Sequence, residues 1–207
     1  DGFGLRFKED VVLHNPVDVK RIRGEISEGF EGADDKAVKF ITVGRLTFEK
    51  AYDALIEHLA GFEMAQPWTL DILGEGDERA KLEGLIEAHG LQDKVFLKGH
   101  QDNPWDQVAR ADAFLLTSLW EGMPNAALES LVCGTPVIGI TSAGGINEIA
   151  AHAGADAVQL GKTMDEIVAL MGAVAPQAKE MAGESLLPQN FELGTVCAAF
   201  EDILGRL

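Results

Sequence analysis

Basic residues are scarce in this sequence. Lys and Arg number 17 against 34 Asp and Glu, which gives a formal net charge of −17 at pH 7. Proteins that bind nucleic acid or an anionic membrane surface by charge gather cations on one face. The composition therefore predicts neither as a partner and favours a soluble protein.

Cysteine and long apolar runs are also scarce. The two cysteines, Cys133 and Cys197, lie in apolar stretches without C-x-x-C spacing, so neither a disulfide framework nor a zinc site is expected. Buried thiols in a reducing compartment are the usual outcome, which predicts a cytoplasmic location. No segment approaches the ~18 apolar residues that a membrane-spanning helix needs. With 46% hydrophobic residues among 207, the chain can bury one large core.

Short apolar, β-branched runs recur along the chain, each about as long as a buried strand. They predict strands at 11–14, 38–43, 69–73, 95–98, 113–117 and 136–140. Apolar residues at helical spacing predict helices at 51–60, 77–89, 164–174, 177–187 and 191–205, and the polar residues 24–36 predict a loop. Alternating strands and helices are typical of βαβ units. We therefore expect a doubly wound, Rossmann-like α/β fold with about six parallel strands.

Ligands of such sheets bind at the carboxyl ends of the strands. Most of the segments that follow the predicted strands contain glycine, as at Gly44, Gly74 and Gly99. One glycine there is most simply explained by a tight turn. Several on one edge of a sheet favour a long, flat ligand, because glycine permits close approach of the backbone.

The stretch SLWEGMPNAALESL, residues 118–131, offers an anion site. Pro124 suits the first position of a helix, which would leave the NH groups of Asn125, Ala126 and Ala127 without partners inside the helix. Helix ends of this kind bind phosphate.

Two glutamates flank this helix start. Glu129 leans back toward the helix N-terminus, where its carboxylate can accept two hydrogen bonds from a ribose diol. Glu121 precedes the turn and would face a sugar on the far side of the anion. Arg45 and Lys50 follow another strand end, and their two charges match a diphosphate diester without any metal. Each residue alone is ordinary on a protein surface; their arrangement at strand ends of one sheet favours a site.

Three stretches resemble a known family: GRLTFEKAYDALIEHLA at 44–60, LDILGEGDERAKLEGLIEAHGLQDKVFLKGH at 70–100 and EGMPNAALESLVCGTPVIGITSAGGINEI at 121–149. They look like the donor-binding C-terminal domain of the large group 1, or family-four, retaining glycosyltransferases of GT-B fold. That family is known by an E-x7-E motif, here Glu121 and Glu129. Residues 11–18 resemble its strand at the domain boundary and 190–204 its closing helix. The match is specific because GxP, CGTPVI and GGxxE flank the motif in order.

The resemblance implies roles for individual residues. Arg45 and Lys50 would hold the nucleotide diphosphate, Glu129 the ribose hydroxyls, and Glu121 would lie near the donor sugar; Glu121, Arg45 and Lys50 are the expected catalytic residues. The whole donor-binding set comprises Gly44, Arg45, Lys50, Gly74, Lys98, Gly99, His100, Glu121, Gly122, Met123, Pro124, Asn125, Ala126 and Glu129. The expected ligand is a UDP- or GDP-linked sugar, and neither a cofactor nor a metal is expected. Two positions depart from the family: Ala51 replaces its usual glycine and Asn147 its frequent proline.

The resemblance also implies a missing half. Full enzymes of this family have a second Rossmann-like domain that binds the acceptor, and the chain begins DGFGLRFKED without an initiator Met. We expect residues 1–10 to be a linker or expression remnant and 11–207 to be the nucleotide-sugar-binding half. The implied reaction is metal-independent, retaining transfer to a glycan, lipid or polysaccharide precursor. The half alone is expected to be inactive, and any peripheral membrane association would run through the missing domain.

Three alternative functions share some features with this sequence. Gly74-Glu75-Gly76 suggests a nicotinamide-dependent oxidoreductase, but that fingerprint requires Gly or Ala where Arg79 stands. A nucleotide-sugar epimerase shares the GT-B architecture and similar carboxylates and is the nearest rival. A binding-only domain with a regulatory or scaffolding role is the third alternative.

Overall fold

The computed structural model describes residues 13–30, 36–177 and 179–205. Six strands form one parallel sheet in the order β3-β2-β1-β4-β5-β6. They are β1 (Val38–Val43), β2 (Trp68–Leu73), β3 (Val95–Gly99), β4 (Ala113–Leu116), β5 (Val137–Ile140) and β6 (Val158–Gly161). Strands β1 to β3 are added toward one edge of the sheet and β4 to β6 toward the other, so the strand order reverses between β1 and β4, as in the Rossmann fold. The predicted fold class is confirmed.

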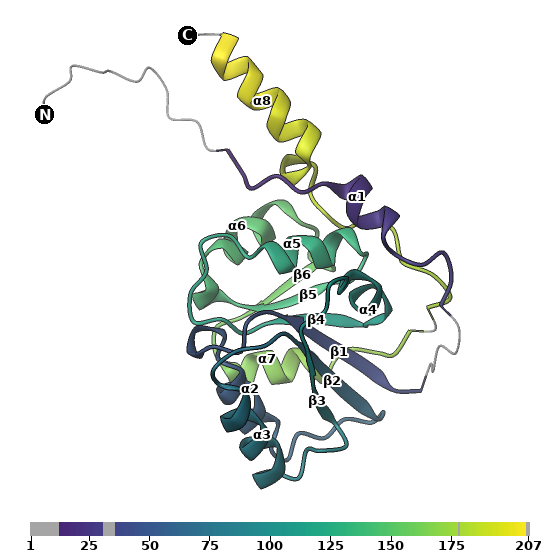
Figure 1. Ribbon diagram of the computed structural model, residues 1–207, viewed down its shortest axis with the longest axis vertical. Coiled ribbons are helices and arrows are strands. Elements are labelled where there is room, and N and C mark those ends of the chain that lie inside the picture. Colours follow the sequence, from purple (N-terminus) through teal and green to yellow (C-terminus); the bar gives the residue numbers. More distant parts are fainter. Residues whose placement is uncertain (1–12, 31–35, 178, 206–207) are drawn as a thin grey trace, which may run out of the picture.

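Helices cover both faces of the sheet (Figure 1). The helices are α1 (Val19–Gly24), α2 (Tyr52–Leu59), α3 (Arg79–Ala88), α4 (Trp105–Arg110), α5 (Asn125–Val132), α6 (Gly145–His152), α7 (Met164–Met171) and α8 (Leu193–Gly205). Helices α2, α3 and α7 lie on one face, and α4, α5 and α6 lie on the other. Helix α8 projects away from the sheet (Figure 1), and its first residue, Leu193, donates its NH to the Val17 carbonyl at 3.0 Å. Short 3-10 turns occur at Phe48–Lys50, Thr141–Ala143 and Gln189–Phe191.

The core lies between the sheet and these two helical layers. Phe114 of β4, Ile72 of β2 and Leu128 of α5 are fully buried. The central strands are nearly continuous apolar runs because both of their faces are covered. A packed sheet of this kind holds the loops after β1 and β4 in fixed relative positions, and these loops form the site described below.

The sixth strand differs from the prediction. It is β6, Val158–Gly161, and not the run at 11–14. Leu13 and His14 are not in a strand, and Val17 makes only an isolated bridge to Glu192; residues 1–12 lie outside the described ranges. The sequence VQLG was overlooked because it has four residues, one polar and one glycine, whereas VVLH matched the expected pattern better.

The helix predicted at 177–187 is also wrong. Outside residue 178, this segment has no helix. It is an irregular segment, here called the strap, that is bonded to the rest of the domain. The Lys179 ammonium donates to the carbonyl of Ala111, and the Leu186 NH donates to the carbonyl of Leu131 at 2.8 Å. Tertiary hydrogen bonds thus override local helix propensity. Helices α1, α4 and α6 were not anticipated, and the predicted loop 24–36 is described only for residues 24–30 and 36.

Two further points concern composition. Cys133 is buried, and burial raises the pKa of its thiol to about 12. Cys197 is exposed, which corrects the expectation that both thiols are buried. In the described ranges, none of the helices combines the length and apolar character needed to cross a bilayer.

Ala51 has an unusual backbone conformation. It ends the 3-10 turn Phe48–Lys50 and precedes α2 with φ 52° and ψ 35°, in the left-handed region. This conformation costs a residue with a Cβ about 1–2 kcal/mol, and glycine adopts it freely. The geometry explains why glycine is usual at this position in the family that the sequence resembles.

We predict that Ala51→Gly raises the free energy of unfolding by about 0.5 kcal/mol, because relief of the strain outweighs the lost methyl contact and the gain in unfolded-state entropy. The matched control is Ala169→Gly on the exposed face of α7, which should lower it by about 1 kcal/mol. Urea unfolding followed by circular dichroism measures both. Equal losses in the two variants would show that Ala51 carries no strain.

Candidate functional site

A cavity of about 500 Å³ opens beyond the carboxyl ends of β1 and β4, where the strand order reverses. Ligand sites of doubly wound folds lie at this position. The cavity is lined by Val43, Gly44, Arg45, Glu49, Lys50, Leu116, Trp120, Glu121, Gly122, Met123, Pro124, Asn125, Ala126 and Glu129. Its walls are therefore the loop after β1 and the loop from β4 into α5.

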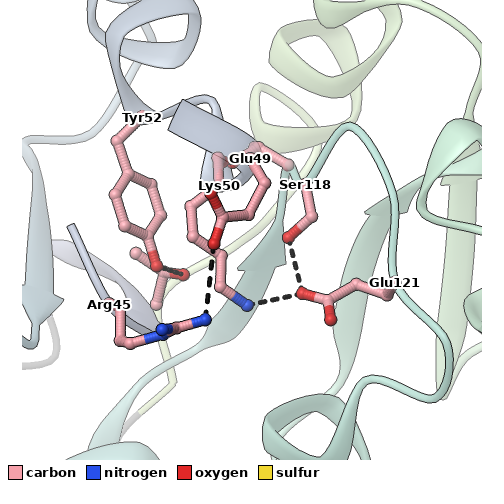
Figure 2. Close-up of polar contacts among 8 residues, drawn as sticks. Arg45, Glu49, Lys50, Tyr52, Ser118 and Glu121 are labelled. Carbon is pink, nitrogen blue, oxygen red and sulfur yellow. Dashed lines mark hydrogen bonds and ion pairs between the residues drawn. The ribbon is translucent and has the colours of Figure 1, made fainter. Parts of the chain in front are cut away.

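Lys50 and Glu121 join these two walls. The Lys50 ammonium lies 2.5 Å from Glu121 Oε1 (Figure 2). The side chains of Lys50 and Glu121 are 19% and 18% exposed. Ser118 Oγ donates to the same carboxylate oxygen at 2.9 Å. A short ion pair that is mostly shielded from water is stronger than a surface pair, since water screens it less.

Arg45 and Glu49 form a second, more open pair. The Arg45 guanidinium lies 3.4 Å from Glu49 Oε1, and the Arg45 side chain is 78% exposed. The pKa of the Glu49 carboxyl is lowered, first by a hydrogen bond from its own backbone NH and further by the charges of Arg45 and Lys50. Arg45 and Lys50 thus extend toward one region from the same loop (Figure 2), each beside a carboxylate that balances its charge.

Backbone contacts fix the two walls against each other. Thr117 Oγ1 donates to the Lys50 carbonyl at 2.8 Å, and the Leu119 NH donates to the Glu49 carbonyl at 2.8 Å. These bonds hold the loop after β1 beside the loop after β4. The Lys50–Glu121 ion pair therefore forms between two loops whose backbones are already held next to each other.

Tyr52 is the first residue of α2, directly after the loop that carries Arg45 and Lys50, and it is 3% exposed. Its hydroxyl lies 3.3 Å from Thr42 Oγ1. Burial raises the pKa of the Tyr52 phenol to about 12, and the negative charge of Glu121 acts in the same direction. A Cβ on Gly44 would lie 2.7 Å from this hydroxyl, so Tyr52 leaves no room for a side chain there.

The helix that starts beside the cavity differs by one residue from the prediction. Pro124 is the N-cap of α5 and Asn125 its first residue. The Ala127 NH donates to the Pro124 carbonyl at 3.0 Å, which corrects the expectation that this NH lacks a partner. The NH groups of Asn125 and Ala126 have no acceptor within the helix, as is general for the first residues of a helix.

Glu129 reaches the cavity from the second turn of α5. Its Oε2 accepts a hydrogen bond from Trp105 Nε1 at 2.9 Å. The Asn125 side chain at the helix start accepts a bond of 3.1 Å from Asn15. Both motif glutamates therefore line the same cavity, Glu121 from before the helix start and Glu129 from its second turn.

Within the described ranges, the remaining predicted residues lie outside this lining, near the ends of β2 and β3. The Gly74 NH donates to the Gly99 carbonyl at 2.8 Å, and Gly74 has φ +146° with the Gly44 carbonyl 1.9 Å from where a Cβ would stand. The Lys98 ammonium lies 3.6 Å from Asp71 Oδ2, and the His100 side chain is 75% exposed. The roles predicted for these residues stay predictions.

Sequence reasoning missed several residues of the site. Ser118 lies in the strand-end segment that was singled out, so its position after β4 was the available signal. Glu49 was overlooked between two cations. Trp105 is 24 residues from Glu129, and no local spacing could have joined them. In the described part of the chain, no group of three or more His, Cys, Asp or Glu side chains is arranged to hold a metal ion.

The sequence matches the family described as "Glycosyl transferases group 1" over residues 25–173. This match covers well over half of the 207 residues, and the chain belongs to this family. The predicted family is thereby confirmed, whereas the roles of the E-x7-E glutamates and the retaining mechanism stay predictions.

One curated relative is the N-acetylgalactosamine-N,N'-diacetylbacillosaminyl-diphospho-undecaprenol 4-alpha-N-acetylgalactosaminyltransferase of Campylobacter jejuni. It is 31% identical over 150 residues, which cover 71% of this chain and 39% of the relative. This chain spans well under half of the length of this and other curated relatives that it matches.

Solved structures of GT-B glycosyltransferases share the fold. The apo form of the lipopolysaccharide outer core galactosyltransferase WaaB matches with a TM-score of 0.72 and 26% identity, over 99% of this chain and 58% of that one. Anabaena HepE in complex with UDP and glucose matches with a TM-score of 0.74 and 19% identity, over 95% of this chain and 57% of that one.

We predict that Tyr52 titrates near pH 12, because burial raises its pKa to about 12 from an ordinary value of about 10. Tyr52 is the only tyrosine of the chain, so the phenolate signal can be assigned to it. The unfolded chain ionises near pH 10, so this contribution to stability is complete below pH 10 and is lost between pH 10 and 12. Phenolate absorbance after a rapid pH jump measures the folded protein.

Two variants separate burial from charge in this titration. Glu121→Gln should lower the midpoint, because it removes the negative charge that opposes the phenolate. Glu129→Gln should leave the midpoint unchanged, since that carboxylate has no part in the shift. A Glu121→Gln midpoint equal to that of the wild type would show that Tyr52 does not sense the site.

Proposed function

We propose that this chain is the donor-binding half of a glycosyltransferase that moves a sugar from a UDP- or GDP-linked donor to a glycan, lipid or polysaccharide precursor. The observation that carries the proposal is the single cavity lined by Arg45, Lys50, Glu121, Glu129 and the start of α5. Membership of the group 1 glycosyl transferases supports the same reaction class.

The charges of the cavity suit a diphosphate. Two cations face a ligand segment that carries two negative charges, and the NH groups at the start of α5 add partial positive charge. Lys50 can donate three hydrogen bonds, so it can contact phosphate while still holding Glu121. The Arg45 guanidinium lies 3.4 Å from the Glu49 carboxylate, and the Arg45 side chain is exposed. Because water screens such a pair, separating Arg45 from Glu49 should cost little free energy.

The carboxylates suit hydroxyl groups on both sides of the diphosphate. We assign Glu129 to the ribose diol and Glu121 to the transferred sugar, with Arg45, Lys50 and Glu121 acting in catalysis. Because Arg45 and Lys50 can neutralise the leaving diphosphate, we infer that transfer needs no metal. We further infer retention of the anomeric configuration, with the leaving phosphate accepting the proton of the acceptor.

Two matched proteins inform the acceptor class. The name of the Campylobacter relative describes a diphospho-undecaprenol acceptor, and WaaB is a lipopolysaccharide galactosyltransferase. A lipid-linked or cell-surface glycan precursor is thus the proposed acceptor class, bound by a further domain. We place the full-length enzyme in the cytoplasm, at the membrane face where lipid-linked precursors lie.

The purified chain should bind one of UDP, GDP or ADP, or its sugar conjugate, more tightly than ~10 mM by titration calorimetry. Arg45→Ala and Glu129→Ala should each weaken this binding about tenfold or more, because each removes a charge-assisted hydrogen bond. UDP is the first probe because HepE, a protein of the same fold, was solved with it.

The matched control for lost charge is Lys94→Ala. Lys94 directly precedes β3, so it lies at the amino ends of the strands, whereas the cavity opens beyond their carboxyl ends. Lys94→Ala should therefore leave nucleotide affinity unchanged. Affinity should also be equal in EDTA and in excess Mg²⁺. Absence of nucleotide binding below ~10 mM would refute the donor site; binding that appears only with Mg²⁺ would refute the metal-independent part.

We also predict that the purified 207-residue polypeptide transfers no sugar on its own, because the proposed site binds only the donor. Radiolabelled UDP-hexoses incubated with a lipopolysaccharide fragment and the chain should give no labelled product. The Arg45→Ala protein, purified in the same way, reveals any contaminating enzyme. Product formed by the wild-type chain and not by this variant would contradict the assignment of a donor half.

A further inference from the structure

Trp105 makes a hydrogen bond that links α4 to the site. Its indole NH donates to Glu129 Oε2 at 2.9 Å, and both side chains are partly buried at this contact. Trp105 is the first residue of α4, whereas Glu129 lies in the second turn of α5. The contact therefore crosses between two helices that pack on the same face of the sheet.

The Trp105 ring approaches the carboxylate from outside the donor cavity. Trp105 lines a neighbouring cavity of about 400 Å³ beside Asn15, Asp18 and Arg21. Glu129 lines both this cavity and the cavity of about 500 Å³ at the ends of β1 and β4, here called the donor cavity, whereas Trp105, among the described residues, does not line the donor cavity. The indole thus contacts one side of the carboxylate and leaves the side that faces the donor cavity open.

The position of Trp105 is itself fixed by several contacts. Asn103 Oδ1 accepts a hydrogen bond of 3.1 Å from the Trp105 backbone NH, and Asn103 Nδ2 donates to the Glu25 carbonyl at 2.8 Å. The Arg21 guanidinium lies 5.7 Å from the ring centroid, within the range of a cation–π contact. The donor to Glu129 is therefore held by its own neighbours.

We propose that Trp105 is a positioning residue that fixes Glu129 for recognition of a ribose, so that discrimination between ribose and 2′-deoxyribose in the donor nucleotide depends on its indole NH. The proposal rests on the proposed donor site and deepens it. An ionised carboxylate offers about four lone-pair positions. The indole occupies one, and the remaining positions can accept both hydroxyls of a ribose.

The physical gain is preorganisation. A free glutamate loses several rotamers when it binds a ligand, and that loss weakens binding. A carboxylate already held by Trp105 has lost this freedom before the ligand arrives. The benefit grows with the number of hydroxyls that bond to the carboxylate, so a ribose with two hydroxyls gains more than a 2′-deoxyribose, which offers only its 3′-hydroxyl.

The test compares UDP with 2′-deoxy-UDP, together with the matched ADP and GDP pairs, by calorimetry on the whole chain. In the wild type the ribonucleotide should bind about tenfold more tightly than its deoxy counterpart. In Trp105→Phe this ratio should fall to about threefold or less, because the ring remains and only the indole NH is lost. Glu129→Gln should reduce the ratio similarly.

The matched control is Trp68→Phe. Trp68 is a buried tryptophan on β2 whose indole NH has no hydrogen-bond partner among the described residues. Its replacement deletes an indole NH without altering Glu129, and the wild-type ratio should persist. Thermal unfolding of each variant confirms that the compared proteins are folded.

The outcomes are distinct. A Trp105→Phe protein that keeps the wild-type ratio, even if both nucleotides bind less tightly, shows that Trp105 is merely structural and overturns the proposal. Lack of binding by every ribonucleotide overturns the donor site itself and this inference with it. Should Trp105→Phe not fold, the indole NH resonance of Trp105 in the wild type decides: it should shift more with UDP than with 2′-deoxy-UDP, and equal shifts overturn the proposal.

Discussion

The Lys50–Glu121 pair is the contact on which the rest of the site depends. It joins the loop after β1 to the loop after β4 across the point where the strand order reverses. Such a pair would contribute little on an open surface. Here it forms between backbones already held by the Thr117–Lys50 and Leu119–Glu49 hydrogen bonds. The fold therefore supplies most of the ordering, and the ion pair adds direction to two side chains.

The acidity of the chain bears on how the proposed site would select an anionic ligand. With a net charge of −17, the protein repels anions at long range, although salt screens this repulsion beyond about 10 Å. Fixed local cations would offset this repulsion and favour binding of a diphosphate. In the proposed function Arg45 and Lys50 supply these cations from one loop, and without a ligand Arg45 is paired with Glu49 and Lys50 with Glu121.

The sequence predicted the fold well where patterns are local. Five of the six strands follow from apolar runs, because central parallel strands are buried on both faces. The sixth, Val158–Gly161, has too few apolar residues to stand out, and the strap around Lys179 and Leu186 is held by partners far away in the chain. Arg45, Lys50 and Glu121 were singled out because each follows a strand end, and Glu129 because it lies more than one turn into the helix that starts beside Glu121. Trp105 was not found, since its importance arises only where α4 meets α5.

The contacts of the two motif glutamates set their tasks apart. Glu121 Oε1 accepts bonds from Lys50 and Ser118, so its position is coupled to the cation that would meet the leaving phosphate. Glu129 is held instead by a neutral indole, which leaves its negative charge unneutralised for a ligand's hydroxyl groups. A carboxylate next to a cation accepts further hydrogen bonds less strongly than one with a neutral partner, because the cation already stabilises its charge. These contacts support the proposed roles, in which Glu129 accepts hydrogen bonds from the ribose hydroxyls and Glu121 links the donor sugar to the charge on the diphosphate.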